Sequence, residues 1–332
     1  MKAFSLGASI VLIRQVFSNP VPEKCLSMQD AAISTAVTAS LTVSTSNPTS
    51  NEMGSNAIES DTAEKPTSLQ GKTERVASQE ESDIFAVFAA YSGAAYTVTD
   101  QWNCKYACEW PGTEGTVVEH HWSVSFPPSA GYIARNPNSK VIVVAFQGTE
   151  DQSQWSDNLD FALDQWPTSI SGSKVHSGFL RGYLDARDSI IPNLQTIASD
   201  YPDHSIALVG HSLGGARAAL CVLDLSLSSP GLLPRMYLYT QGQPRIGNKV
   251  FADAMDALEV PKYREVYEYD IVPRVPPEFL GYSHFKTEAW IHENDTILCI
   301  NPIDGNSCSG DGDFLHPLSI VDHERYPGLK YE

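Results

Sequence analysis

A serine between two glycines is the residue of this chain whose surroundings best fit a nucleophile. Gly210-x-Ser212-x-Gly214 follows a short apolar run, residues 205–209, and precedes a helix-like run, residues 216–223. In the order strand, turn and helix, the serine sits on a sharp turn that exposes its Oγ at the positive end of the helix. A side chain in place of either glycine would collide with the neighbouring elements. The pattern predicts that Ser212 attacks a carbonyl carbon, which is the chemistry of acyl transfer.

A serine hydroxyl needs a base that takes its proton and an acid that orients the base. In this architecture the acid follows the serine along the chain and the histidine comes last. Asp270 lies directly after a predicted strand, residues 263–269, where the catalytic groups of a parallel sheet collect. Four histidines follow it: His284, His292, His316 and His323. We favour His323, which lies near the end of the chain after a long loop, but the spacing leaves His316 as a close rival.

Acyl transfer also requires N–H donors aimed at the oxygen that becomes negative. The backbone N–H of Leu213, directly after the nucleophile, is the first expected donor. The second should come from the turn after an adjacent strand, and Gln147-Gly148-Thr149 follows the buried-strand run 140–146. Gly148 permits a tight turn, and Thr149 can offer its N–H and its hydroxyl. We therefore predict an oxyanion hole formed by Leu213 and Thr149.

Strand and helix patterns alternate along the part of the chain that carries these residues. A capping box, Ser78 with Glu81, opens the first predicted helix, in which apolar residues recur at helical spacing. Predicted strands cover residues 140–146, 205–209, 236–239 and 263–269, and further predicted helices cover residues 185–200, 216–223 and 250–258. This alternation predicts an α/β fold with a mostly parallel central sheet flanked by helices.

The N-terminal part of the chain has a different composition from the rest. All 14 tyrosines and all six tryptophans lie beyond Phe85, and no aromatic residue lies between Phe17 and Phe85. A Ser/Thr-rich segment of this kind buries too little apolar surface to offset its conformational entropy. We expect a signal segment over residues 1–18 and a propeptide or disordered leader over 19–77, with an O-glycosylated stalk as the alternative. The catalytic domain is expected over residues 78–332.

Charge and cysteine usage limit the functional classes and the compartment. The net charge of −18 argues against a nucleic-acid partner, and no apolar stretch is long enough for a membrane span. Cys104–Cys108 and Cys299–Cys308 could each close a small disulfide loop, which fits an oxidising, extracellular compartment. Cys221 is expected to be a buried free thiol. The cysteines lack the second pair that a zinc site requires, so we predict no metal, and we also predict no cofactor. We expect a secreted monomer.

Several segments together carry a resemblance to a known family. They are Trp102-Asn103-Cys104 with Cys108, 146–149, 174–180, 210–216, 239–247, 270–274, and Asp322-His323 with Tyr326. With them the chain resembles the secreted fungal class 3 lipases of the Rhizomucor and Thermomyces type, which also include feruloyl esterases. The resemblance implies an α/β-hydrolase fold with a lid, and a triad of Ser212, Asp270 and His323. It also places an oxyanion residue at Thr149 and favours His323 over His316.

The lid of that family follows the oxyanion residue, here residues 150–161. Trp155 and Leu159 lie at helical spacing among acidic and amide residues, as in an amphipathic lid that opens at a lipid–water interface. This favours a triacylglycerol lipase, with a feruloyl or short-chain carboxylesterase as the alternative. A non-catalytic binding protein is a remote alternative, because it would be expected to have a broken triad.

Three departures from the family pattern carry expectations of their own. Gln147 stands where the family has arginine, and this removes a cation beside the oxyanion turn. The disulfide that joins the first helix to the C-terminus lacks both cysteines. Tyr326-Pro327-Gly328 replaces Tyr-Phe-Gly, so we expect a less firmly anchored loop around His323.

Overall fold

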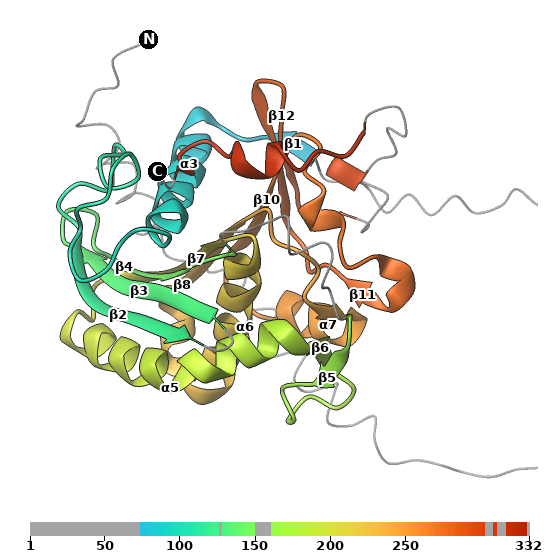
Figure 1. Cartoon of the computed structure of the whole chain (residues 1–332), viewed down its shortest axis with the longest axis horizontal. Helices are drawn as coiled ribbons and strands as arrows, with labels where there is room; N and C mark the ends of the chain where they lie inside the picture. Colours follow the sequence, from blue (N-terminus) through green and yellow to red (C-terminus); the bar gives the residue numbers. More distant parts are fainter. Residues whose placement is uncertain (1–73, 126–127, 150–160, 303–307, 311–316, 331–332) are drawn as a thin grey trace, which may run out of the picture. The chain divides into compact units, whose positions relative to one another are not determined.

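A large mixed sheet organises the protein. The computed structural model describes residues 74–125, 128–149, 161–302, 308–310 and 317–330. Within these residues nine strands form one sheet, in the order β1-β13-β12-β10-β8-β7-β4-β3-β2 (Figure 1). The strands are β1 (Glu74–Val76), β2 (Val117–Ser125), β3 (Pro128–Asn136), β4 (Val141–Phe146), β7 (Ser205–His211), β8 (Met236–Gln241), β10 (Lys262–Tyr267), β12 (Glu288–His292) and β13 (Asp295–Cys299).

The centre of the sheet is parallel and its edges are antiparallel. Strands β4, β7, β8, β10 and β12 run parallel to one another, so their carboxyl ends meet at one edge. The pairs β2–β3, β3–β4, β12–β13 and β1–β13 are antiparallel. A smaller described sheet joins β5 (Leu163–Gln165), β6 (Lys174–His176), β9 (Gly247–Asn248) and β11 (Tyr282–Ser283).

Helices cover both faces of the large sheet (Figure 1). One face packs against α3 (Gln79–Ala94), and the other packs against α5 (Ser177–Asp200) and α6 (Leu213–Ser228). Side chains alternate between the two faces along a strand, so Val143 of β4 faces α3 and Val144 belongs to the α5–α6 core. A short helix, α7 (Lys249–Asp256), follows β9.

The α/β fold is confirmed, while several element boundaries differ from the predicted ones. The capping box forms as predicted: Glu81 N–H donates to Ser78 Oγ at 3.2 Å and Ser78 N–H to Glu81 Oε2 at 2.8 Å. Helix α5 starts eight residues before the predicted start, at Ser177, because the side chain of His176 accepts hydrogen bonds from the first turn. Strand β1 pairs with β13 and lies before Ser78, so the folded part begins no later than Glu74.

Both predicted disulfides are present. Cys104 and Cys108 are joined with a Cα–Cα distance of 5.2 Å, and Cys299 and Cys308 with 6.4 Å. Cys221, on α6, is a buried free thiol as predicted. Among the described residues no helix combines the length and apolarity that crossing a membrane requires.

Candidate active site

Ser212 lies on the turn between β7 and α6 in a strained backbone conformation, with φ of 58° and ψ of −129°. The two flanking glycines make this turn possible. A Cβ on Gly210 would lie 2.3 Å from the carbonyl carbon of Gly214, and a Cβ on Gly214 would lie 2.1 Å from the carbonyl oxygen of Phe146. These are the collisions expected from the sequence, and only glycine avoids them.

The backbone around Ser212 is held from two sides. Its N–H donates to the carbonyl oxygen of Gln241, at the end of β8, at 2.8 Å. Its own carbonyl oxygen accepts from Gly215 N–H at 3.0 Å, in the first turn of α6. The N–H groups at the start of α6, beginning with Leu213, have no partner four residues earlier within the helix. A positive helix end therefore lies directly after the serine.

The predicted oxyanion turn packs against the turn that carries Ser212. Gly148 approaches so closely that a Cβ there would lie 2.2 Å from the hydroxyl oxygen of Tyr96 and 3.3 Å from Ser212 Cβ. Thr149, the next residue, is half-buried. Leu213 and Thr149, the two predicted donors, thus belong to two turns that touch beside Ser212.

Asp270 lies at the carboxyl end of the parallel strands, three residues after β10, and is fully buried. Its carboxylate accepts three hydrogen bonds. Oδ2 accepts from His323 Nδ1 at 2.8 Å and from the Tyr326 hydroxyl at 2.6 Å. Oδ1 accepts from Val272 N–H at 2.8 Å. This set of donors fixes the orientation of the carboxylate.

His323 lies on a short 3₁₀ helix, η6 (Asp322–Glu324), and is fully buried. Its Nδ1 is engaged by Asp270, so the other nitrogen, Nε2, is the atom available for proton transfer. Among the described residues Nε2 has no hydrogen-bond partner, and no bond joins it to Ser212 Oγ. Catalytic hydrogen bonds are often long without substrate and shorten in the reacting complex.

A second histidine links the turn that carries Ser212 to His323. His211 Nε2 donates to the backbone oxygen of His323 at 2.8 Å, and His211 Nδ1 lies 2.8 Å from the Tyr96 hydroxyl. Burial, followed by the nearby His323, lowers the pKa of His211 well below its usual value, so this ring stays neutral. Gly242 packs closely against His323 and Asp270: a Cβ at this position would lie 2.6 Å from His323 Cε1 and 2.8 Å from Asp270 Oδ2.

Comparison with known proteins places this geometry in one family. The family model described as Lipase (class 3) matches residues 143–280. A lipase from Rhizomucor miehei is 33% identical over 263 residues, which cover 77% of this chain and 71% of the relative. The chain belongs to the class 3 lipase family. As a class 3 lipase it is a carboxylic-ester hydrolase.

Two further relatives of this class 3 lipase extend the comparison. The secreted mono- and diacylglycerol lipase A of Penicillium cyclopium is 31% identical over 252 residues, which cover 72% of this chain and 81% of the relative. A solved triacylglycerol lipase superposes with a TM-score of 0.72 at 32% identity, covering 77% of this chain and 99% of the other. The catalytic centre of that protein is described as a serine protease triad. The fold is accordingly the α/β-hydrolase fold.

In the class 3 lipase, the structure brings five predicted site residues to one edge of the sheet. Ser212, Asp270, His323, Thr149 and Leu213 all lie on turns that follow parallel strands or on the loop that crosses them. The predicted lid residues Trp155 and Leu159 lie outside the described residues, as do the rival histidine His316 and the predicted signal and leader segments. These assignments remain predictions.

The loop that carries His323 is anchored more firmly than the sequence led us to expect. The Tyr326 hydroxyl reaches Asp270, and burial followed by the negative Asp270 raises the pKa of Tyr326 well above its usual value. Gly328, with φ of 87°, packs so close to α3 that a Cβ would lie 2.0 Å from the Ala86 carbonyl oxygen. Leu329 is buried beside Tyr326. The tail is therefore held by packing on α3 without the family's disulfide.

Sequence reasoning did not assign roles to Tyr96, His211, Gly242 or Tyr326. His211 and Tyr326 lie inside segments that carry the family resemblance, so a hydrogen-bonding role could have been inferred for them. Tyr96 has no such pattern, because its contact with His211 joins residues 115 positions apart. Gly242 also lies inside such a segment, 239–247, but its role follows only from its φ of 58° and its contact with His323.

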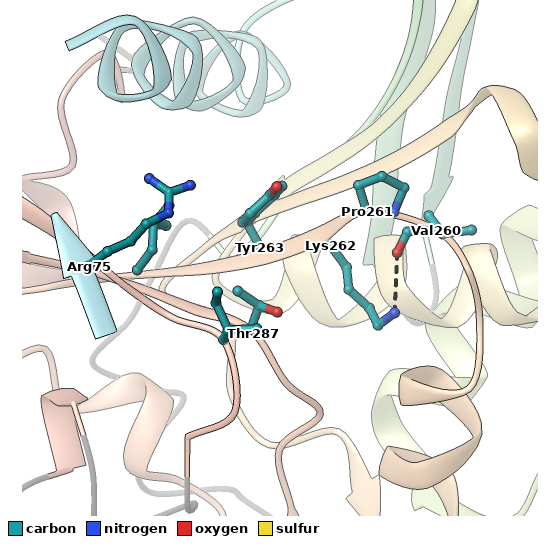
Figure 2. A pocket seen from close by; sticks show the side chains of 8 residues that line it. Arg75, Val260, Pro261, Lys262, Tyr263 and Thr287 are labelled. Carbon is teal, nitrogen blue, oxygen red and sulfur yellow. Dashed lines mark hydrogen bonds between the residues drawn. The ribbon is translucent and has the colours of Figure 1, made fainter. Parts of the chain in front are cut away.

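Within the described residues, a cavity and a cluster of potential metal ligands contain none of the residues of this site. A cavity of about 250 Å³ lies at the opposite end of β10 and is lined by residues that include Arg75, Lys262 and Thr287 (Figure 2). Lys262 is bound there to the Val260 carbonyl oxygen at 3.2 Å. The one described group with metal-ligand geometry contains Glu74 and two cysteines that are joined in a disulfide.

Proposed function

We propose that this class 3 lipase hydrolyses acylglycerol esters through an acyl-enzyme on Ser212. In the first half-reaction Ser212 Oγ bonds to the ester carbonyl carbon while its proton passes to His323 Nε2. The carbonyl oxygen becomes negative and accepts hydrogen bonds from the donors at Leu213 and Thr149. When the tetrahedral intermediate collapses, the bond to the alcohol oxygen breaks, and His323 returns the proton to that oxygen.

In the second half-reaction water repeats the same steps. His323 Nε2 removes a proton from water as the water oxygen bonds to the acyl carbon, and the bond to Ser212 Oγ then breaks. The proton returns from His323 to Ser212 Oγ, and a fatty acid leaves. Asp270 stabilises the imidazolium through the bond to Nδ1.

The buried His323–Asp270 pair carries this proposal. A fully buried histidine and carboxylate joined at 2.8 Å contribute little net stability to a fold, because both groups lose hydration, so a purely structural role explains the pair poorly. His211 links this pair to the adjacent Ser212, which has a φ of 58°, and this fits the arrangement that activates a hydroxyl nucleophile. Tyr326 and Val272 add hydrogen bonds to Asp270 that keep it in the orientation this chemistry needs.

Apolar side chains near the base support an ester in a lipid–water interface as the substrate. Leu318, Ile320 and Val321 are each about half exposed on the segment that leads to His323, and Phe279 is 86% exposed on the loop after Asp270. A monomer working at an interface can use such residues to contact lipid. The alternative substrate class is a feruloyl or short-chain ester. Secretion is supported by the two disulfides and by the secreted Penicillium relative.

Rates on emulsified triolein and on dissolved methyl ferulate test the substrate class. We expect the wild-type enzyme to prefer triolein, and Ser212→Ala to lose turnover on both esters while it still folds. A strong preference for methyl ferulate would replace the lipase proposal by the feruloyl esterase alternative. Undiminished turnover by Ser212→Ala would overturn the nucleophile assignment, and no turnover of any ester by the wild type would favour a binding protein.

A further inference from the structure

A row of three buried polar side chains crosses the sheet beneath the catalytic residues. His211, Gln241 and Glu265 occupy adjacent register positions on the parallel strands β7, β8 and β10. Residues in register on parallel neighbours point to the same face of a sheet, here the face that α3 covers. All three side chains are at most 1% exposed. The triad uses none of them as nucleophile, base or acid.

Each member of the row holds a different part of the catalytic machinery. His211 donates to the backbone oxygen of His323 at 2.8 Å. The backbone carbonyl oxygen of Gln241 accepts from Ser212 N–H at 2.8 Å. The carbonyl oxygen of Glu265 accepts from Gly242 N–H at 3.0 Å, and Gly242 packs against His323 and Asp270. A displacement of the row would therefore move nucleophile, base and acid together.

Glu265 is the unusual member of the row because no cation within the described part of the chain neutralises it. Its Oε1 accepts one hydrogen bond, from Gln241 Nε2 at 2.6 Å. Its Oε2 and the Gln241 side-chain oxygen have no partner among the described residues. The neighbouring Arg264 points to the other face, where it pairs with Glu288. Burial raises the pKa of Glu265 to about 8, although the hydrogen bond from Gln241 acts in the opposite direction.

The groups that face Glu265 leave it in uncharged surroundings. The titratable residues on this face are Tyr237 and Tyr239 of β8, Tyr263 and Tyr267 of β10, Tyr326 of the C-terminal segment and His211 of β7, with Tyr91 of α3 and Tyr132 of β3 in the same cluster. Burial raises the pKa of Tyr239 and Tyr326 well above their usual value and lowers that of His211, so these three are neutral at pH 7. The facing residues of β12 and α3 are Ala289, Phe88 and Ala89. The charged groups beyond this shell are Asp270, behind Tyr326, and Glu81, which is paired with Arg75.

We propose that Glu265 is a positioning residue that acts as a neutral carboxylic acid, holding the carboxyl ends of β7, β8 and β10 beneath the triad. In this form its O–H can donate to the Gln241 side-chain oxygen, which belongs to the amide that already donates to Oε1 and has no partner of its own among the described residues. Two hydrogen bonds then join the acid and the amide. The inference rests on the proposed function, because it concerns the placement of Ser212, His323 and Asp270.

Ionisation of Glu265 should disturb this arrangement. A carboxylate has no donor to offer Gln241, and its charge is buried without a cation. The folded-state pKa of about 8 lies above the ordinary value of 4.5, so the unfolded carboxyl loses its proton first as pH rises. On account of this group the free energy of unfolding falls between these two pH values, and the active arrangement is lost as pH passes about 8.

Glu265→Gln tests the proposal, because an amide keeps both hydrogen bonds and cannot ionise. We expect its kcat at pH 7 to stay within about threefold of wild type, a difference of under 1 kcal/mol. Above pH 8 the wild-type kcat should fall by up to about tenfold per pH unit with little change in KM, and this decline should be absent or shifted upward in the variant. The melting temperature of the variant should also change less between pH 5 and pH 9. Glu268→Gln, at the end of the same strand and bound to His292, is the control and should keep the wild-type pH dependence.

Infrared spectroscopy of the wild type decides the matter even if Glu265→Gln does not fold. A protonated carboxyl has a carbonyl band that a carboxylate lacks, and we expect one such band at pH 7 that disappears as pH passes about 8. No such band, or an alkaline decline of kcat in Glu265→Gln equal to that of wild type, would overturn the proposal. The infrared and melting measurements need no turnover, so they remain decisive if the ester-hydrolase proposal itself fails.

Discussion

The two faces of the large sheet differ in their side chains and in the part of the site that they support. On the face toward α5 and α6, aliphatic side chains such as Ile142 and Leu208 pack against helix residues such as Leu220 of α6, and this face supports the turn that carries Ser212. The face toward α3 contains tyrosines and the row of His211, Gln241 and Glu265, and it leads to Asp270 and His323. Figure 1 shows the two faces separated by the sheet, with α3 on one side and α5 on the other.

Because of this difference, we expect one face to determine mainly the stability of the fold and the other to determine mainly the orientation of the catalytic side chains. Apolar packing is non-directional and strong in sum, so it can hold a strained serine turn in place. Hydrogen bonds are directional, so they can set the orientation of a carboxylate and an imidazole. Substitutions on the α5–α6 face should therefore lower the free energy of unfolding, while those on the α3 face near the site should lower kcat.

The largest effect is expected where the apolar face meets the nucleophile. Gly214→Ala would place a Cβ 2.1 Å from the Phe146 carbonyl oxygen, so the serine turn and the oxyanion turn cannot both keep their places. We expect kcat/KM on triolein to fall by a factor of about 10³ or more, since oxyanion donors alone contribute 10²–10³. Gly231→Ala, which meets no atom within 4 Å, is the control. Near-normal activity of Gly214→Ala would contradict the described turn.

A cavity in the apolar face should reduce stability without affecting catalysis. Leu220 is fully buried on α6, and Leu220→Ala should lower the free energy of unfolding by about 2–5 kcal/mol. Denaturant unfolding measures this change, and kcat well below the melting temperature should stay within about twofold of wild type. Leu227→Ala on the same helix removes a side chain that is 47% exposed and should change stability by under about 0.5 kcal/mol. A large drop in kcat for Leu220→Ala would break the proposed separation.

The opposite result is expected for a hydroxyl on the α3 face. Tyr326→Phe removes one of three hydrogen bonds to Asp270, and a bond to a charged group is worth about 1.5–3 kcal/mol. We expect kcat to fall by about 10–100-fold with little change in KM. The buried Tyr91 hydroxyl, which bonds Thr116 at 2.9 Å, provides the matched control. Tyr91→Phe should lower stability but leave kcat unchanged; equal losses of kcat in both variants would refute a role specific to Asp270.

The start of α3 provides the smallest expected effect. Glu81 bonds Ser78 N–H and Arg75, and the bond from Arg75 is the largest cause that lowers the pKa of Glu81 to about 2. A lowered carboxyl pKa stabilises the fold above the ordinary value of 4.5 and stops doing so as pH falls through about 2. Glu81→Gln should cost about 1 kcal/mol at pH 7 because this end of α3 is partly exposed.

Thermal unfolding as a function of pH measures this contribution. The difference between wild type and Glu81→Gln should shrink toward zero below about pH 2–3, where both side chains are neutral. Glu80→Gln, one residue earlier and outside the capping box, should follow the wild type at every pH. A difference between wild type and Glu81→Gln that grows on acidification would contradict the assigned ion pair.

Local patterns explain what could be predicted from the sequence. The glycines around Ser212, the capping box at Ser78 and the position of Asp270 after a strand depend on a few adjacent residues, so their geometry follows from local sterics and hydrogen bonding. The boundary of α5 was missed because a histidine, His176, caps its first turn, in place of the usual Ser, Thr, Asp or Asn.

Long-range contacts explain which features could not be predicted from the sequence. Spacing alone left His323 and His316 as rivals, since no local rule says which loop folds back over the sheet. The contact of His211 with His323 joins residues 112 positions apart, and the Gln241–Glu265 pair depends on the register of two strands. The hairpin β2–β3 at one edge of the sheet and the strands β12 and β13 near the other edge were also absent from the prediction, because their patterns are short or irregular.

Covalent labelling of the nucleophile tests the central claim most directly. An alkylphosphonate ester reacts with an activated serine by forming a bond to Oγ and releasing its leaving group, and mass spectrometry of the digested protein locates the label. We predict one label per chain, on the peptide that contains Ser212, with parallel loss of triolein hydrolysis and no labelling of Ser212→Ala. Labelling of another serine, or hydrolysis that persists once Ser212 is fully modified, would contradict the account.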